Sequence, residues 1–451
     1  MNCKPGLIQR EIDPSQLAEE LKLSDGGDLG LQARKHAREE DRDERSWQLG
    51  KVLIVEDISK ELIEELGSKL DIDPMFFAAH VHSDWRGAEA PTPKYCELPS
   101  QTWQQQDNQR QQRQFATFHY HRSLVFPEIE NQDFKLLRRA NISRKVVVFP
   151  SNQDHRLGLS QHCCSTMVLR PTQENARCLG IILTDPPMSE TYISLRGTQQ
   201  VAINTLSRPL FGGAIPMEPT ERDVPTRGAM RSMLQELLCY WSNNPPLHGA
   251  TNSSALGELS YHPLRIICSE WVNYKALMCF SLREYDTLLS GGYDADLQLE
   301  KINSALMAIS SWPRRVASST DSLNRGLSFI EHHADQAGAS ADNAWVLLHK
   351  DYEYLIQSIS QQGDQLQAAI PLVSTFLQLV EGRRNYAETR IMSRLSILAL
   401  VFVPLSFVSS LFSMNETFSP GGPMFWVYFA TAIPVLTSVL LFAARPLSPG
   451  R

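Results

Sequence analysis

The stretch FVPLSFVSSLFSMNETFSPGGPMFWVYF, residues 402–429, joins two long apolar runs through a short polar segment. The first run covers residues 395–414 and the second covers residues 424–444, so they are 20 and 21 residues long. An α-helix needs about 20 apolar residues to cross about 30 Å of hydrocarbon. Each run contains one proline, which transmembrane helices tolerate. We therefore expect two transmembrane helices, with residues 415–423 as an external loop between them.

Arginine residues are distributed unevenly around these two runs. The loop contains neither Lys nor Arg, and cytosolic loops of membrane proteins are the ones enriched in these residues. We therefore expect an integral membrane protein with both termini in the cytosol, in the plasma membrane or alternatively in the vacuolar membrane. The arginines that flank the runs are Arg383, Arg384, Arg390, Arg394, Arg445 and Arg451.

The bulk of the chain is expected to be soluble. Of the 451 residues of the whole chain, 42% are hydrophobic and 21% are charged, which is an ordinary globular balance. The formal net charge of −7 disfavours nucleic acid as a partner, because phosphate binding needs a basic surface. The sequence contains no GxSxG, P-loop or HExxH motif, so no motif indicates an enzyme.

Hydrophobic patterning divides the soluble part into four segments. Residues 1–46 mix both charge signs with little to bury and are predicted to be a disordered lead. Residues 47–228 alternate strand-like and helix-like runs, which predicts a cytosolic α/β domain that ends in an irregular linker from residue 186. Residues 229–362 have helical periodicity, and residues 363–394 are predicted to form a stalk helix. The strand candidates are 51–59, 115–126, 145–149, 162–169 and 178–185.

The stalk is predicted to continue directly into the first transmembrane run. A single helix from Gly363 to Phe412 would be about 75 Å long at 1.5 Å per residue. Near the other end of the soluble part, Ser59 is a candidate N-cap and Pro74 is expected to open a second helix. Residues 445–451 form the predicted cytosolic tail. The fold class is thus an α/β domain plus a long stalk helix and two C-terminal transmembrane helices.

One side of the first transmembrane run carries small or weakly polar residues at alternating spacings of four and three. This pattern fits either a helix-packing seam or one wall of a water-filled path. No ionisable residue lies inside either run, so neither run contains a residue that could relay protons. Two helices cannot enclose a pore, so any pore needs several copies around an axis. The stripe consists of Met392, Ser396, Ala399, Val403, Ser406 and Ser410.

A polar residue, Asn415, directly follows the first run. If the first run lines a pore, one Asn415 from each copy converges at its external mouth. An amide is a neutral dipole that can hydrogen-bond the hydration shell of a cation, and Mg²⁺ releases its waters reluctantly. Glu416 would add negative charge that concentrates cations. Asn415 is therefore the predicted contact to a hydrated metal ion.

The ending RLSILALVFVPLSFVSSLFSMN, followed by a short loop and a second apolar run, resembles the CorA-like divalent-cation transporters. That family carries a Gly-Met-Asn triplet after a first span that contains Pro-Leu. The segments GIILTDPP (180–187) and EWVNY (270–274) resemble, more weakly, the variant common in filamentous fungi. By position, Ser413, Met414 and Asn415 occupy the triplet, with serine in place of glycine.

The resemblance implies a homopentamer that transports Mg²⁺ or another divalent cation and needs no cofactor besides the transported ion. Because serine replaces glycine at residue 413, a membrane-anchored scaffold or sensor that conducts little stays as the alternative. The sequence does not decide between Mg²⁺ and Zn²⁺, Co²⁺, Ni²⁺ or Mn²⁺ as the transported ion. It also does not decide between import and export. The resemblance places along the pore Met392, Leu395, Val403, Ser406 and Ser410, a set that nearly coincides with the stripe.

Two further groups in the soluble part have the residue types of metal ligands. His80, His82 and Asp84 have strand-like alternation that would suit a metal, although solvated histidines are the simpler interpretation. The vicinal Cys163 and Cys164 either bind a soft metal or fill the interior beside a strand.

Overall fold

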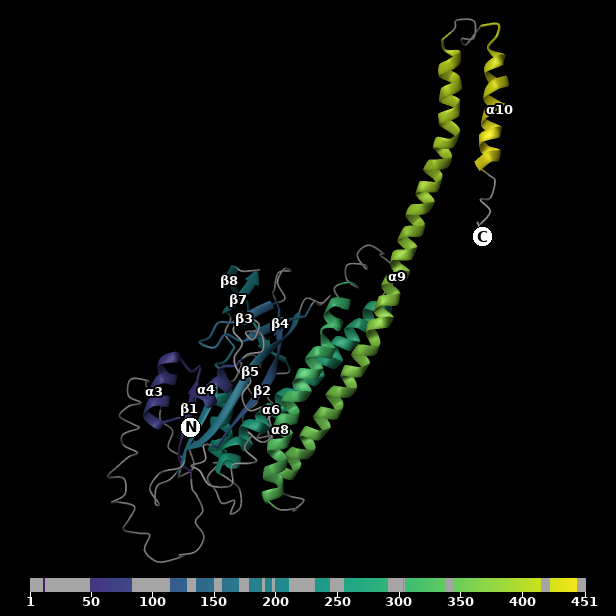
Figure 1. The fold of residues 1–451 in the computed structure, drawn as a ribbon. Helices are drawn as coiled ribbons and strands as arrows, with labels where there is room; N and C mark the ends of the chain where they lie inside the picture. Colours follow the sequence, from purple (N-terminus) through teal and green to yellow (C-terminus); the bar gives the residue numbers. More distant parts are fainter. Residues whose placement is uncertain are drawn as a thin grey trace, which may run out of the picture. The chain divides into compact units, whose positions relative to one another are not determined.

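The computed structural model of the chain divides into two units (Figure 1). One unit comprises residues Met1–Gly291 and Ser304–Ile370, and the other comprises Gly292–Asn303 and Pro371–Arg451. The structure describes residues 11–12, 49–82, 114–127, 135–149, 156–169, 178–188, 191–196, 199–210, 232–243, 255–290, 303, 305–337, 344–414 and 422–443. The predicted disordered lead and cytosolic tail therefore lie almost entirely outside the described residues.

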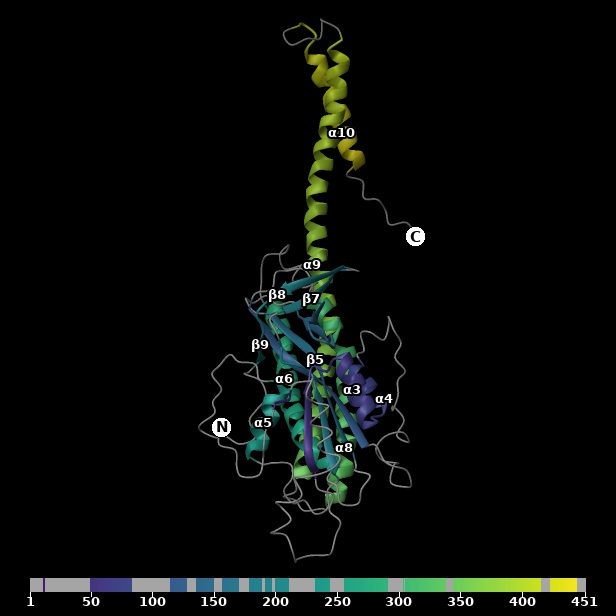
Figure 2. The same ribbon diagram turned by 90° about the vertical axis from the view of Figure 1, so that its left-hand side faces the viewer.

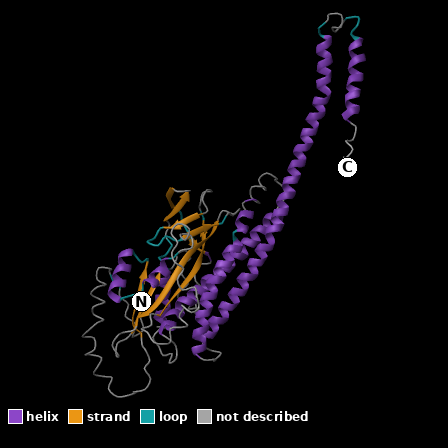
Figure 3. Ribbon diagram, in the orientation of Figure 1, coloured by secondary structure: helices purple, strands orange, loops and turns teal. Residues whose placement is uncertain are grey.

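A mixed sheet of nine described strands forms the centre of the first unit (Figure 3). The strands are β1 (Leu49–Glu56), β2 (Gln114–Phe126), β3 (Lys135–Arg138), β4 (Lys145–Val148), β5 (Arg156–Leu169), β6 (Cys178–Thr184), β7 (Thr191–Arg196), β8 (Gln199–Asn204) and β9 (Arg208–Pro209). Their order is β1-β6-β5-β4-β3-β7-β8, and β2 pairs with β5 and β9 off this path. Only β1 and β6 pair in parallel among these strands.

The predicted irregular linker is wrong in its first part. Residues 191–209 contain β7, β8 and β9, and β7 pairs antiparallel with both β3 and β8. Strand β3 is also absent from the prediction. These strands are short and only partly apolar, and they are stabilised by partners distant in sequence, which local patterning does not reveal.

Two short helices, α3 (Lys60–Leu70) and α4 (Pro74–Val81), cover one face of the sheet. Ser59 caps α3 by accepting a hydrogen bond from the Leu62 backbone N–H at 3.3 Å, and Pro74 opens α4, as predicted. Their apolar side chains share a buried cluster with residues of β1, β5 and β6. The cluster includes Val55, Leu66, Phe76, Phe77, Met167, Ile181 and Leu183.

Further helices cover the opposite face of the sheet (Figures 1 and 2). They include α5 (Met233–Asn243), α6 (Ala255–Ser290) and α8 (Trp312–Ala337). On β5, Ser165 hydrogen-bonds His80 of α4, whereas the next residue, Thr166, hydrogen-bonds Ser260 of α6. Successive side chains of a strand point to opposite faces, so the sheet lies between two helical layers.

The predicted long helix is present and is longer than expected. Helix α9 runs from Ala344 to Phe412 over 69 residues, which corresponds to about 100 Å. The predicted stalk begins at Gly363, but this glycine lies inside the helix. A Cβ atom there would lie 2.7 Å from Cγ1 of Val316 on α8. Gly363 therefore allows close helix packing and does not mark a helix start.

The apolar C-terminal part forms the end of α9 and a second helix, α10 (Trp426–Ala443). Among the described residues, α9 is the one helix long and apolar enough to cross a membrane. Helix α10 is apolar but shorter, with 18 residues against the 21 predicted for residues 424–444. A first membrane crossing is therefore consistent with the structure, and the second crossing stays a prediction.

Candidate functional site

The residues predicted to line a pore share one side of α9. We call Met392, Leu395, Ala399, Val403, Ser406 and Ser410 the candidate pore face. At about 100° per residue, these six positions lie within a sector of about 80°. All six are exposed in the single chain, with 71% exposure for Met392, 62% for Leu395 and 64% for Val403. The helix thus brings the predicted residues together on one exposed surface of the part of the unit that the structure describes.

Helix α10 covers the opposite side of α9. Val408 and Ala432 are buried, with exposures of 6% and 4%, and the rings of Phe412 and Tyr428 meet edge to face at 6.1 Å. Val408 lies about 160° around the helix from Met392. The packing seam of the hairpin and the candidate pore face are therefore different surfaces of α9.

The candidate pore face is weakly polar and carries no charge. The Ser406 hydroxyl donates a hydrogen bond to the Val403 carbonyl at 2.9 Å. Its proton is thus used within the helix, while its oxygen lone pairs can still accept hydrogen bonds from water. Such a surface can contact a hydrated ion without binding it tightly.

The predicted mouth of the path is only partly described. The Ser413 backbone N–H donates to the Ser409 carbonyl at 3.0 Å, and Met414 is 86% exposed. The helical path therefore reaches the signature triplet. Asn415 and Glu416, the residues predicted to meet the ion there, lie outside the described residues.

Acidic side chains precede the candidate pore face on the same side of α9. Every residue from 381 to 399 is exposed. Glu381 and Glu388 lie within about 40° of the direction of Met392, at the soluble end of the helix. The Glu388 carboxylate also pairs with Arg384 at 3.2 Å. On this side of α9, two acidic residues thus precede the uncharged candidate pore face. Their negative charge favours the approach of cations.

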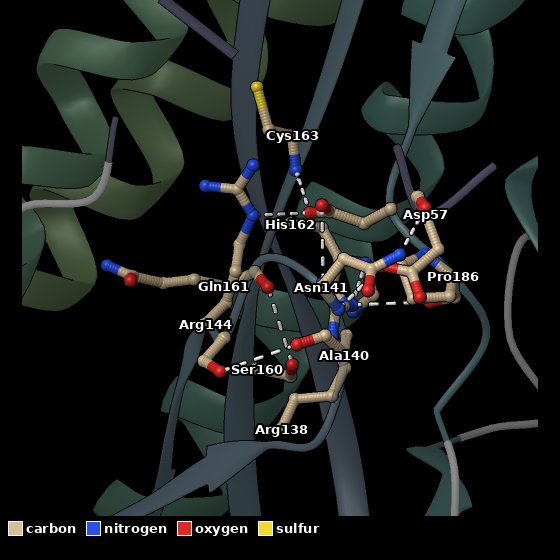
Figure 4. Close-up of polar contacts among 12 residues, drawn as sticks. Asp57, Arg138, Ala140, Asn141, Arg144, Ser160, Gln161, His162, Cys163 and Pro186 are labelled. Carbon is tan, nitrogen blue, oxygen red and sulfur yellow. Dashed lines mark hydrogen bonds and ion pairs between the residues drawn. The ribbon is translucent and has the colours of Figure 1, made fainter. Parts of the chain in front are cut away.

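A buried polar network in the first unit is absent from the sequence predictions (Figure 4). Asp185, at the end of β6, accepts hydrogen bonds from Arg144 Nε at 2.6 Å and from the Cys163 backbone N–H at 2.7 Å. Its second oxygen lies 3.2 Å from Nη2 of Arg138. Arg144 also donates to two carbonyls at the end of α4, and Arg138 donates to the Pro186 carbonyl. One carboxylate thus ties together β3, β5, β6 and α4.

The electrostatics of this network favour one set of charges. Burial would raise the pKa of Asp185, but the charges of Arg144 and Arg138 outweigh burial and hold that pKa well below its ordinary value. Burial lowers the pKa of His80 to about 3, and burial with Arg138 lowers the pKa of His162 well below its ordinary value. The carboxylate is therefore ionised and both imidazoles are neutral near pH 7.

The alternative metal sites of the soluble part are not assembled in the structure. His80 is buried on a helix, where Nδ1 lies 3.0 Å from Ser165 Oγ, so neither strand-like alternation nor a solvated ring is correct for it. Cys163 and Cys164 are fully buried, and burial raises the pKa of the Cys163 thiol to about 12. In the part of the chain that the structure describes, no three His, Cys, Asp or Glu side chains are grouped to hold a metal. Asp84 lies outside that part.

Comparison with known proteins identifies the region that contains the candidate pore face. Residues 306–445 match the family model described as CorA-like Mg²⁺ transporter protein. The match spans about a third of the chain and confirms the predicted resemblance for these residues. The matched family consists of transporters and not enzymes, in agreement with the motif analysis. The resemblance to the fungal variant stays a prediction.

Two solved structures show a weaker likeness. The complete structure of the CorA magnesium transporter from Methanocaldococcus jannaschii is 12% identical, with a TM-score of 0.37 over 87% of this chain and 90% of that chain. The full-length CmaX protein is 14% identical, with a TM-score of 0.30 over 70% of this chain and 78% of that chain. Both TM-scores are below 0.5, so each likeness is weak. No curated protein matches the chain.

Proposed function

We propose that the chain is one subunit of an oligomeric channel or transporter for divalent cations, with Mg²⁺ as the favoured ion. The observation that carries the proposal is the candidate pore face. It is uncharged, exposed and opposite the side covered by α10, and it lies in the segment matched to the transporter family. A surface with these properties needs further copies of the chain to become the wall of a closed path.

The proposed path selects its ion through the ion's hydration shell. In this proposal, Glu381 and Glu388 concentrate cations at the soluble end, and serine hydroxyls contact their waters along the helix. Asn415 forms a ring of neutral amides at the external mouth, with Glu416 as a negative ring beside it. Weak, neutral contacts suit Mg²⁺ because this ion keeps its waters and has to leave the path as easily as it enters.

The proposed orientation follows from the arginines around the hairpin. Arg383, Arg384, Arg390 and Arg394 precede the apolar end of α9, and no basic residue occurs in residues 415–423. The positive-inside rule then places both termini in the cytosol and the loop outside. We propose the plasma membrane as the site, with the vacuolar membrane as the alternative.

Uptake into liposomes tests this function directly. Purified protein reconstituted with a trapped Mg²⁺-sensitive dye is expected to give Mg²⁺ influx above that of protein-free liposomes, because the assembled path lets the ion cross the hydrocarbon. Parallel influx measurements with Co²⁺, Ni²⁺, Zn²⁺ and Mn²⁺ determine the ion preference. Absence of influx for all five ions, with correctly inserted protein, would favour the membrane-anchored scaffold that Ser413 suggests.

Assembly is tested separately from transport. One hairpin cannot enclose a path, and the resemblance implies a pentamer, so five 50.9 kDa chains are expected to form a particle of about 250 kDa in detergent. Light scattering with correction for bound detergent gives the protein mass. A stable monomer or dimer would contradict the pore, whatever the uptake assay shows.

A further inference from the structure

Three arginines form a separate surface on α9 just before its apolar end. We call Arg383, Arg390 and Arg394 the arginine stripe. Their spacings of seven and four keep them within about 20° of one line along the helix. All three are exposed, and no ion pair involves them in the part of the chain that the structure describes. By contrast, the neighbouring Arg384 pairs with Glu388 on its own helix at 3.2 Å.

The arginine stripe lies opposite the candidate pore face. Its direction around α9 is about 180° from Met392 and coincides with that of Val401 and Val408, on the side of α10. Glu381 and Glu388 lie instead on the side of the candidate pore face. Around this part of the helix, the acidic and the unpaired basic side chains therefore occupy opposite sides.

The depth of the arginines matches that of lipid headgroups. Arg394 directly precedes Leu395, the first residue of the apolar run, and Arg390 lies about 7.5 Å from Leu395 along the helix axis. The headgroup layer on each side of the hydrocarbon is about 5–8 Å thick, so both residues fall within it. Arg383 lies about 18 Å from Leu395, beyond this layer but close enough to sense its surface charge.

We propose that the arginine stripe binds the headgroup phosphates of anionic phospholipids in the cytoplasmic leaflet. A guanidinium group forms paired hydrogen bonds with phosphate oxygens, and clusters of basic residues beside a transmembrane helix are attracted to anionic lipid. Lipid binding needs only that α9 enters the bilayer in the proposed orientation, and it does not depend on ion transport. The proposal and the transport function can therefore fail independently.

A neighbouring copy of the chain is a less suitable occupant of this surface. In a ring of identical subunits, every copy turns the same side of α9 towards the common axis. If that side is the candidate pore face, Glu381 and Glu388 face the axis as well, whereas the arginines face outwards. The outward side of a transmembrane helix ends among lipids, and the charge of the arginine stripe is complementary to anionic headgroups.

Lipid titration of the detergent-solubilised full chain tests the proposal. Native mass spectrometry counts bound phosphatidylserine or phosphatidylcholine per oligomer. Arg390→Gln and Arg394→Gln are each expected to weaken phosphatidylserine binding about fivefold, and the double variant about 25-fold. Arg383→Gln is expected to weaken it less, because this residue lies below the headgroup layer. Binding of phosphatidylcholine is expected to stay unchanged in all variants.

Arg384→Gln is the matched control. It removes the same charge from the same segment, but from a side chain that is paired within its helix and lies about 100° from the arginine stripe. Its phosphatidylserine binding is expected to equal that of the parent. Equal losses for Arg384→Gln and Arg394→Gln, or full binding by the double variant, would overturn the proposal. A double variant that falls apart into smaller oligomers would identify the stripe as a subunit interface instead.

Discussion

Asp185→Ala is expected to lower the midpoint of thermal unfolding of the first unit by at least about 5 °C. The carboxylate is buried between Arg138 and Arg144, so its removal leaves two buried guanidinium groups without a compensating charge. Breaking a buried ion pair from one side typically costs about 3–5 kcal/mol. The Cys163 backbone N–H also loses its acceptor. The free energy of unfolding should fall by more than any surface substitution causes.

A thiol-reactive fluorescent dye can follow this unfolding in the full chain once the cysteines other than Cys163 and Cys164 are replaced by serine. Cys163 and Cys164 are fully buried beside the network and react only when the sheet opens. Asp321→Ala is the matched control, because it removes an exposed carboxylate from α8 in the same unit. Such surface changes usually alter stability by less than about 0.5 kcal/mol. Equal midpoints for the two variants would show that the Asp185 network contributes nothing to stability.

Two milder variants distinguish the loss of a compensating charge from a general failure to fold. Asp185→Asn keeps the shape and one acceptor oxygen, so it should fold and lose less stability than the alanine variant. Arg138→Met should destabilise the Asp185→Ala protein less than it destabilises the parent, because it then removes an uncompensated charge. Equal effects of Arg138→Met in both backgrounds would mean that the two residues do not interact.

The stability difference between the parent and the Asp185→Asn variant should depend on pH in a definite direction. The pKa of Asp185 is lower in the folded protein than in the unfolded chain, where it is about 3.9. Its ionised form therefore stabilises the fold above about pH 4, and this contribution declines as the pH falls further. The stability difference between the parent and Asp185→Asn should narrow over that range.

The candidate pore face was predictable from sequence because it depends only on local geometry. Spacings of four and three place residues on one side of any α-helix, whatever lies around it. The same rule places Val408 on the side that α10 covers. Gly363 has no Cβ atom, and Val316 of α8 occupies the place where that atom would lie. The helix therefore continues through a residue that sequence alone suggests as its beginning.

The buried network was not predictable for the opposite reason. Asp185 lies 41 residues beyond Arg144 in the sequence, and its contact with Arg138 and Arg144 depends on the register of β3, β4, β5 and β6. A signal was present, since all three charged residues stand at the ends of apolar strand runs. This signal does not reveal which of the three charged residues contact one another. His80 was missed similarly, because its burial depends on how α4 packs against β5.

Asn415→Ala is expected to reduce initial Mg²⁺ influx to nearly that of protein-free liposomes, with oligomer size and unfolding temperature unchanged. In the proposed path, the ring of Asn415 amides supplies the neutral hydrogen bonds that the ion's waters meet at the external mouth. Alanine offers these waters no hydrogen bond, so a hydrated ion would have to lose solvation at this point. Mg²⁺ loses its waters reluctantly, and the barrier to entry should therefore rise steeply.

Substitutions of neighbouring loop residues determine whether this loss is specific to the amide. Thr417→Ala removes a polar group two residues further along and is expected to leave influx unchanged. Glu416→Gln should reduce influx mildly, and more at about 0.01 M than at about 0.15 M ionic strength, because the screening length falls from about 30 Å to about 8 Å. Influx is compared at matched protein content in the liposomes. If Asn415→Ala transports as well as the parent, the triplet does not select the ion in this protein, and another part of the path has to do so.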